Sequence, residues 1–449
     1  MNLLPRRRLP LVLVACLLPA LSAIVHADAP APLPATAAEA ARDMALHCGH
    51  LFDAASGMLL GAHTLVVQGG RIAAVHPGRV DAASADTIDL SAHTCMPGWI
   101  DLHTHLTFRV DARAYDQLPR VDTADLALLG ARNARVTLLA GFTTVRNLGD
   151  LGNESIALRN AIRQGLVDGP RMFTAGRAIT ATGGHADYSN GLSQRLVGDP
   201  GPFEGVVNSP DDAYKAVRQR YKDDADVIKV TATGGVLSLS RNGENPQMRQ
   251  QELDAVVAAA HDYGLKVAAH AHGLEGIKRA LRASVDTLEH GTALDDEAIA
   301  AMKRQGTVYV PTLSAAAHLA EQVDRPGAYP EIVRRKIQGV DAQRKIAFDK
   351  ARRAGVRIAF GSDAGPVPHG ENAREFVELV DAGLNPAQAL QAATIRAAEA
   401  LGETATLGTL DPGKFADIVA VRGDPTAQIA LTRTPSFVMK QGRVYLAPD

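Results

Sequence analysis

The sequence predicts an α/β protein, a (β/α)8 TIM barrel with a small β-sandwich domain. From about residue 97 to 405, short apolar runs alternate with longer amphipathic stretches, a pattern typical of parallel strands followed by helices. Eight such units fit a barrel of this kind. The runs are GWIDLH, FTTVRNL, RMFTAG, DVIKVTA, KVAAHAH, DTLEHG, TVYVPTL and RIAFGSD.

Segments of a different pattern flank the predicted barrel over 97–405. Residues 44–96 alternate polar and apolar side chains between turn signals such as Gly69-Gly70, which predicts short antiparallel strands. Residues 406–449 return to this pattern. We therefore expect 44–96 and 406–449 to form one small β-domain. The long loop from about residue 180 to 210 is expected to be functional or mobile rather than a simple connection.

Residues 1–27 have the layout of a secretory signal peptide. Three arginines precede an apolar stretch, and small residues end at Ala27. The stretch is too short for a membrane span, so we expect a secreted or periplasmic protein with a leader over 28–43. The alternative is lipoprotein processing at Cys16, which follows Leu-Val-Ala.

Cleavage after Ala27 would leave Cys48 and Cys95 as the cysteines of the mature chain. In an oxidising compartment they could form a disulfide. The alternative is that they lie in the core as two small apolar side chains.

The charges of the chain are nearly balanced. The 47 basic residues face 49 acidic ones, for a net charge of -2. No global field therefore favours nucleic acid or an anionic surface.

Six residues that can bind metal lie in, or just after, five of the apolar runs. His103 and His105, two positions apart on a strand, point to the same face. Lys229 lies inside an apolar run, where a charged ammonium is costly unless something compensates it. Alone, each residue could be structural, but catalytic groups of a barrel gather at the C-terminal strand ends. The predicted metal ligands are His103, His105, Lys229, His270, His290 and Asp363.

Six motifs then follow one another along the chain: PGWIDLHTH, IKVTATGG, VAAHAHG, LEHG, GSDAG and LGTLDPGKFADIVAV. With them, the chain from about residue 44 onward resembles the amidohydrolase superfamily in the branch near imidazolonepropionase. Within that branch it is most similar to Xaa-Pro dipeptidases and ochratoxin-hydrolysing amidohydrolases. Imidazolonepropionase as a family uses one metal without a bridging lysine, so Lys229 favours the two-metal relatives.

The resemblance implies a homo-oligomeric enzyme with two divalent ions, zinc by preference. A lysine that has added carbon dioxide becomes an anionic, bidentate carbamate that can bridge two ions. The ions would present a shared hydroxide as the nucleophile. Asp363 would carry its proton to the leaving amine. The implied ligands are His103, His105 and Asp363 for one ion, His270 and His290 for the other, and N6-carboxylated Lys229 as the bridge.

His185 and His272 are further candidates for the catalytic site. His185 follows Gly183-Gly184 and could donate to the carbonyl oxygen as an oxyanion forms, or could be an exposed loop residue. His272 should face the same side as His270 and could orient substrate or support a ligand. Weaker candidates are Arg146 and Tyr188 for a substrate carboxylate, Glu289 for a structural role facing away from His290, and His369 for a helix start.

The resemblance implies hydrolysis of an amide or peptide bond in a small-molecule or dipeptide substrate with a free C-terminal carboxylate. Dipeptides, Xaa-Pro peptides and N-acyl amino acids belong to this class, including ochratoxin A, which would yield phenylalanine and ochratoxin alpha. One alternative is a lactonase or cyclic amidohydrolase that uses the same site. Another is a zinc- and solute-binding protein without catalysis.

Overall fold

The computed structural model describes residues 43–81, 86–108, 117 and 120–448. The predicted signal peptide, Cys16 and the leader as far as residue 42 lie outside the described residues. Within the described part of the chain, no helix is both long and apolar enough to cross a membrane.

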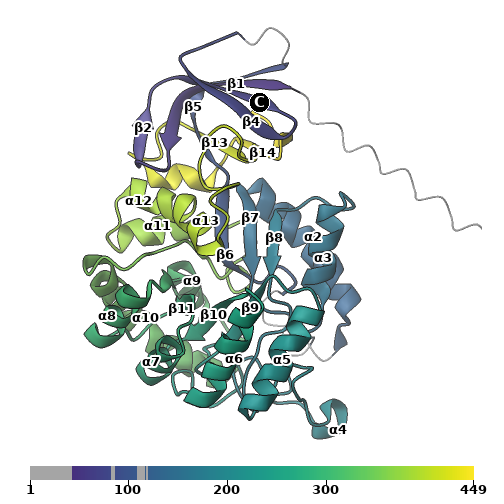
Figure 1. The fold of residues 1–449 in the computed structure, drawn as a ribbon. Coiled ribbons are helices and arrows are strands. Elements are labelled where there is room, and N and C mark those ends of the chain that lie inside the picture. Colours follow the sequence, from purple (N-terminus) through teal and green to yellow (C-terminus); the bar gives the residue numbers. More distant parts are fainter. Residues whose placement is uncertain (1–42, 82–85, 109–116, 118–119, 449) are drawn as a thin grey trace, which may run out of the picture. The chain divides into compact units, whose positions relative to one another are not determined.

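Parallel strands and helices alternate through the larger part of the chain (Figure 1). The first three parallel strands form one sheet and the next four form another. Every residue of β6, β7 and β9 is buried, as expected for parallel strands that are covered on both faces. The strands are β6 (Trp99–Thr104), β7 (Phe142–Asn147), β8 (Arg171–Thr174), β9 (Val227–Thr231), β10 (Lys266–Ala271), β11 (Thr287–His290) and β12 (Val308–Val310).

Short parallel bridges link the two sheets. Ile179, beyond β8, pairs with Val230 of β9. On the other side, Tyr309 of β12 pairs with Ile358, and Thr104 of β6 pairs with Ala364. The segment that contains Ile358 and Ala364 therefore lies between β12 and β6.

The eighth apolar run, 357–363, forms no continuous strand, contrary to the prediction. It has isolated bridges at Ile358 and, just past its end, at Ala364. The Phe360 N–H donates to Ala392 O over 3.0 Å, so it is not available to a neighbouring strand. The Ile100 N–H likewise donates to Ala393 O over 2.7 Å. A connection between two later helices thus interrupts the ladder at this position.

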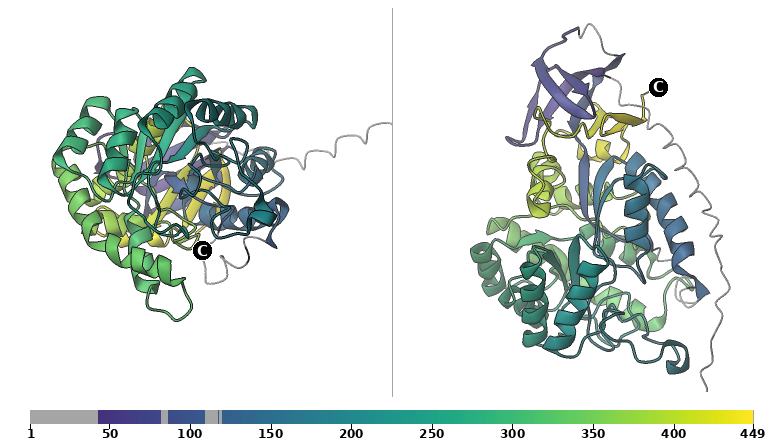
Figure 2. Two further views of the ribbon diagram at one scale, coloured as in Figure 1. Left: turned by 90° about the horizontal axis from the view of Figure 1, so that it is seen from below. Right: turned by 45° about the vertical axis from the view of Figure 1, so that its right-hand side comes forward.

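Helices follow most of the strands and lie outside them, as the view from below shows in teal and green (Figure 2). Their starts are encoded locally: Asp122 forms a capping box for the first, and Ser209 caps a helix that begins with Pro210. The helices are α2 (Thr123–Leu139), α3 (Glu154–Arg163), α4 (Gln194–Val197), α5 (Pro210–Lys222), α6 (Gln250–Asp262), α7 (Leu274–Arg282), α8 (Asp296–Gln305), α9 (Leu313–Gln322), α10 (Glu331–Arg353), α11 (Arg374–Asp381), α12 (Pro386–Ala392), α13 (Ile395–Leu401) and the 3-10 helix η2 (Ile429–Arg433).

The remaining strands form one eight-stranded sheet from both ends of the described chain. The order is β15-β14-β13-β5-β1-β3-β4, with β2 paired to β1. The sheet turns back on itself, because Arg71 of β4 forms an antiparallel bridge to Phe415, just before β13. The strands are β1 (Met44–Asp53), β2 (Met58–Leu60), β3 (His63–Gln68), β4 (Arg71–Pro77), β5 (Asp86–Pro97), β13 (Ile418–Arg422), β14 (Phe437–Lys440) and β15 (Arg443–Leu446).

A disulfide joins Cys48 of β1 to Cys95 of β5 inside the core of this sheet. Their Cα atoms are 5.8 Å apart, within the normal range for a disulfide. Of the two alternatives for these cysteines, the structure therefore supports the disulfide.

We expect the disulfide to stabilise the folded chain, because it closes a loop with a sequence separation of 47 residues. Its removal in a Cys48→Ser, Cys95→Ser double variant should lower the free energy of unfolding by about 2–4 kcal/mol. Denaturant unfolding of both proteins, with and without reductant, measures this difference. A wild-type protein whose stability does not respond to reductant under unfolding conditions would contradict it.

Candidate metal centre and active site

The first group of side chains that could hold a metal lies where β6 ends. His103 is in β6, His105 follows the strand, and Asp363 comes from the segment beyond Ile358. Asp363 Oδ1 lies 3.4 Å from His103 Nε2 and 3.3 Å from His105 Nε2. The backbone supports this arrangement, since the Asp363 N–H donates to His103 O over 2.8 Å. Ligand atoms of the three residues lie within 4.8 Å of one another.

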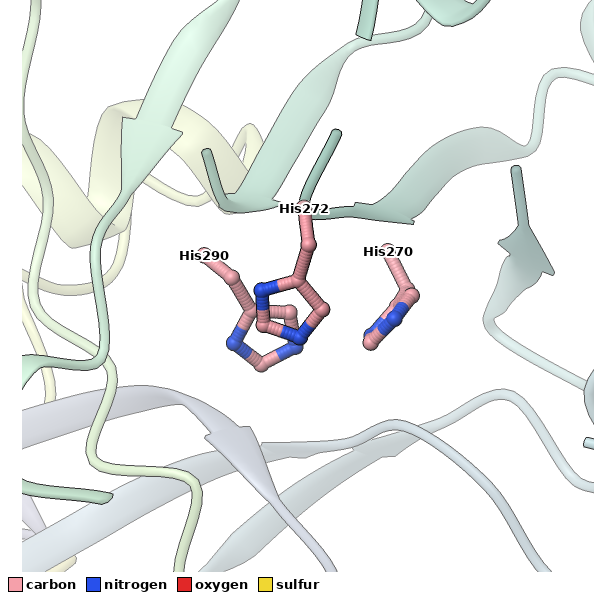
Figure 3. A group of neighbouring side chains, drawn as sticks. All are labelled: His270, His272 and His290. Carbon is pink, nitrogen blue, oxygen red and sulfur yellow. The ribbon is translucent and has the colours of Figure 1, made fainter. Parts of the chain in front are cut away.

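The second group consists of His270, His272 and His290, from the neighbouring strands β10 and β11. Figure 3 shows the three rings close together, and their ligand atoms also lie within 4.8 Å of one another. His290 ends its strand with a φ of 68°, a conformation uncommon outside glycine. His272, the candidate for orienting substrate or supporting a ligand, lies in one group with His270 and His290.

Lys229 lies beside the first group and lines the same cavity as the second. Its Nζ is 3.4 Å from His103 Nε2, and its residue is only 4% exposed. Burial lowers the pKa of Lys229 to about 8. Burial and neighbouring histidines lower the pKa of His270 and His290 in the second group, and the charge of Lys229 adds to this effect.

Four imidazoles of this cluster are held in their neutral form. Burial, followed by Lys229, lowers the pKa of His103 to about 4. Burial likewise lowers the pKa of His272 to about 4, and it places those of His270 and His290 well below the usual value. Neutral imidazoles keep the lone pair that binds a metal, so the protein presents ready ligands rather than cations.

Asp363 supplies the negative charge of the first group. Burial alone would raise its pKa, but His103, His105 and Lys229 outweigh burial and hold the pKa well below the usual range. Its φ is 56°, a strained backbone conformation of the kind that gathers at functional sites. The carboxylate is therefore ionised over the whole physiological pH range.

Glu289 fixes the orientation of His103. Glu289 Oε2 lies 2.9 Å from His103 Nδ1, so a proton on Nδ1 leaves Nε2 free to face Lys229 and Asp363. Burial would raise the pKa of Glu289, but Arg146 and His103 hold it at about 2. We expected Glu289 to be structural and to face away from the site. It supports a candidate ligand instead, because β11 ends at His290 with a positive φ that breaks strand alternation.

Other hydroxyl and amide groups orient the second group. His290 Nδ1 lies 2.7 Å from Thr312 Oγ1, and His272 Nδ1 lies 2.8 Å from Thr292 Oγ1. His270 Nε2 lies 2.9 Å from Gly234 O. In each ring, one nitrogen is bound to the protein and the other is left to bind a ligand.

Both groups line one cavity of about 240 Å³. The long loop after β8 contributes His185 and Tyr188 to its wall. Burial lowers the pKa of His185 to about 3, and its Nδ1 has no hydrogen-bond partner among the described residues. The ring centroids of His185 and His270 are 4.3 Å apart, so the loop brings His185 directly beside the second group.

Two weaker sequence candidates lie elsewhere. Arg146 does not line the cavity, because its guanidinium is 2% exposed and donates to Leu102 O, Thr287 and Glu289. His369 Nε2 lies 3.0 Å from Phe108 O, and α11 begins only at Arg374, so His369 does not start a helix.

Sequence reasoning missed Arg344 and Asp101. Arg344, in the middle of α10, lines the cavity and is 4% exposed, but no motif distinguishes it from the other basic residues of that helix. Asp101 accepts the backbone N–H groups of His103 and Ser362, each over 3.0 Å. It thereby ties together the two chain segments that carry the first group. Its position two residues before His103 in IDLHTH was the available signal.

The donor set suits divalent metal ions. Imidazole nitrogens and a carboxylate are the ligands that zinc takes in catalytic sites, and manganese, cobalt and iron accept the same mixture. Five histidines and Asp363 form two groups. The groups are adjacent, because the ring centroids of His103 in the first and His290 in the second are 4.9 Å apart. The residues present therefore fit a metal centre.

Comparison with known proteins agrees with this geometry. Residues 94–445 match the amidohydrolase family. An ochratoxinase from Aspergillus niger is 32% identical over 372 residues, which cover 79% of this chain and 76% of the relative. A solved Xaa-Pro dipeptidase with methionine bound in its active site is 44% identical, with a TM-score of 0.88 over 90% of this chain and 100% of that one. A prolidase complexed with N-methylphosphonate-L-proline is 30% identical, with a TM-score of 0.82 over 90% and 100%.

The site and these likenesses define an enzyme of the metal-dependent hydrolase class that acts on C–N bonds. The chain belongs to the amidohydrolase family.

The contact between Glu289 and His103 can be tested by substitution. A Glu289→Gln variant loses the charge that orients His103, so metal affinity should fall about 10- to 100-fold. Competition with a chelator, followed by metal analysis, measures the affinity. Glu275→Gln, on an exposed side chain of α7, is the control and should behave as wild type. Equal metal affinity in wild type and Glu289→Gln would rule out this role.

Proposed function

We propose that this protein is a binuclear zinc amidohydrolase. It cleaves the amide or peptide bond of a small substrate that has a free C-terminal carboxylate. The observation that carries the proposal is the presence of two adjacent ligand groups in one cavity, which Lys229 also lines with its Nζ 3.4 Å from His103 Nε2. The scaffold we propose is a closed (β/α)8 barrel, which the parallel bridges on both sides of residues 358–364 and beyond β8 support.

The bridging ligand in this proposal is N6-carboxylated Lys229. A lysine with a pKa of about 8 is partly neutral at physiological pH, and the neutral amine is the form that adds carbon dioxide. The product is an anion, so carboxylation replaces a buried positive charge by a negative one beside the neutral imidazoles of His103, His270, His272 and His290. Two cations would then compensate that charge.

Each ligand group would hold one ion. His103, His105 and Asp363 would hold the first, and His270 and His290 the second. His272 lies near enough to complete the second group or to contact the substrate there. When bound, the two ions would polarise the scissile carbonyl and make a water molecule more acidic.

Asp363 is the proposed proton carrier. Its carboxylate is ionised, so an oxygen is available to accept a proton from the attacking water. The same oxygen can then return the proton to the leaving amine nitrogen. His185, neutral and with an unpartnered buried Nδ1, would donate a hydrogen bond to the carbonyl oxygen as negative charge develops there.

Arg344 is the proposed partner of the substrate carboxylate. It is a cation in the cavity wall that is not among the metal ligands, and a guanidinium binds a carboxylate in a fork geometry. Dipeptides, Xaa-Pro peptides and N-acyl amino acids all present this carboxylate, and so does ochratoxin A. The relatives described as a Xaa-Pro dipeptidase and an ochratoxinase support this range.

The proposal extends to the whole chain. The arginine-led N-terminus supports export to a secreted or periplasmic location, and the disulfide between Cys48 and Cys95 suits an oxidising compartment. We propose that residues 44–96 and 406–449 form one domain and 97–405 the other. Self-association into a homo-oligomer rests on the family resemblance.

The proposed activity is tested with zinc-loaded mature protein and a substrate panel. The panel contains Xaa-Pro dipeptides, N-acyl amino acids, ochratoxin A and simple lactones, and released amino acid is measured by chromatography. We expect turnover of amides with a free carboxylate and little or none once that carboxylate is amidated. Turnover confined to lactones would instead favour a lactonase, and no turnover on the panel would favour a binding protein.

The role of Asp363 can be separated from metal binding. Asp363→Asn cannot take up the proton of the attacking water, so kcat should fall about 100- to 10,000-fold. Metal analysis of the same preparation should still find at least part of the metal, because the histidine ligands remain. Unchanged kcat in a metal-loaded variant would eliminate Asp363 as the proton carrier.

A further inference from the structure

The loop that follows β9, residues 234–245, closes at its base. Thr233 forms an antiparallel bridge to Pro246, and the Gly234 N–H donates to Asn245 O over 3.1 Å. A Cβ at Gly234 would lie 2.0 Å from Asn242 O, so only glycine allows the loop to fold this tightly. We call residues 234–245 the β9 loop.

The β9 loop forms an apolar part of the cavity wall. Val236, Leu237 and Leu239 line the cavity. Val236 also belongs to an apolar cluster with Leu319 of α9 and Ile337 of α10, against which Leu237 and Leu239 pack. The position of the loop on these two helices therefore determines the shape of this part of the cavity.

The start of the β9 loop contacts two histidines of the site. Gly234 O lies 2.9 Å from His270 Nε2. A Cβ at Gly235 would lie 2.1 Å from the ring of His185, so the backbone of the loop packs directly on that ring. A displacement of the loop would reach both the apolar wall and the histidines.

Lys336 of α10 holds the β9 loop from outside the cavity. Its ammonium donates to three backbone oxygens of the loop: Gly235 O over 2.8 Å, Ser238 O over 2.6 Å and Ser240 O over 3.1 Å. These three acceptors match the three protons of the ammonium. The stem of Lys336 lies against Gly243, where a Cβ would be 3.4 Å from its Cδ.

The environment of Lys336 differs from that of a surface lysine. The ammonium is partly desolvated among neutral carbonyl oxygens, and this burial lowers its pKa to about 8. A buried cation loses favourable hydration, and the three hydrogen bonds to the loop offset that loss. Deleting the charge would leave three carbonyl oxygens of the loop without this donor.

We propose that Lys336 is a positioning residue that fixes the β9 loop, and that the wall so formed receives a bulky apolar side chain of the substrate. The second half rests on the proposed amide hydrolysis, since it assigns a substrate side chain to that site. The wall offers branched aliphatic groups from Val236, Leu237 and Leu239, joined by Ala315 and Leu319 of α9. Such a surface gains binding energy from apolar area and discriminates against small side chains.

The test compares Lys336→Met with Lys345→Met. Methionine keeps an unbranched apolar stem and removes the three donors, and Lys345 is an exposed lysine on the same helix.

Two substrate series vary in size on either side of the scissile bond, with alanine, leucine or phenylalanine at the varied position. One of the two series varies the side chain that contacts the β9 loop. In that series, Lys336→Met should raise KM for the leucine and phenylalanine substrates at least about tenfold. KM for the alanine substrate should change less than about threefold, as should kcat throughout. Lys345→Met should match wild type.

A second measurement does not need turnover. Amide hydrogen exchange of peptides covering residues 234–245 should be at least about tenfold faster in Lys336→Met than in Lys345→Met. Lys336→Arg, which keeps charge and donors, should restore part of the protection. Unchanged exchange in Lys336→Met would overturn the positioning role.

The two halves of the proposal fail in distinguishable ways. Equal changes in KM for alanine and phenylalanine substrates, or a uniform loss of kcat, would overturn the assignment of a bulky apolar side chain to this wall. If wild type turned over no amide at all, the proposed function would fail, and the assigned side chain with it. Hydrogen exchange would still decide whether Lys336 fixes the loop.

Discussion

The burial of Lys229 among histidines is the constraint on which the site depends. An ammonium in a strand interior loses its hydration, and one contact of 3.4 Å to His103 Nε2 does not replace it. The fold tolerates it because burial lowers its pKa to about 8 and because Asp363 and Glu289 carry negative charge nearby. Carboxylation and metal binding would convert this unfavourable cluster into a set of compensated charges.

The rest of the scaffold holds that cluster in place. His290, Thr312 and Asp363 all have positive φ, and each is either a candidate ligand or bonded to one. Strain of this kind persists only where the surroundings fix the backbone. Beneath the site, Glu289 links His103 to Arg146 in a buried ion pair of 2.8 Å. Contacts with no direct access to a substrate therefore determine where the imidazole nitrogens point.

The strand order and most candidate ligands could be predicted from the sequence, because buried parallel strands read as apolar runs and their carboxyl ends share one edge. The eighth run does not form a regular strand. The carbonyl oxygens of Ala392 and Ala393, far along the chain, accept the amide hydrogens of Phe360 and Ile100. Two features depend on the positive φ of His290, which the sequence does not indicate. They are the grouping of His272 with His270 and His290, and the contact of Glu289 with His103. Arg344 and Lys336 lie on a helix rich in basic residues, where only packing distinguishes them.

Metal stoichiometry, measured on wild type and on Lys229→Met, tests the central claim most directly. Both proteins would be saturated with zinc in the presence of bicarbonate, freed of excess metal and analysed for zinc per chain. Native mass spectrometry of the wild type would seek the added carboxyl group on the lysine. The account predicts two ions per chain in wild type and a loss of at least one in the variant. One ion per chain in both proteins would contradict a centre bridged by Lys229.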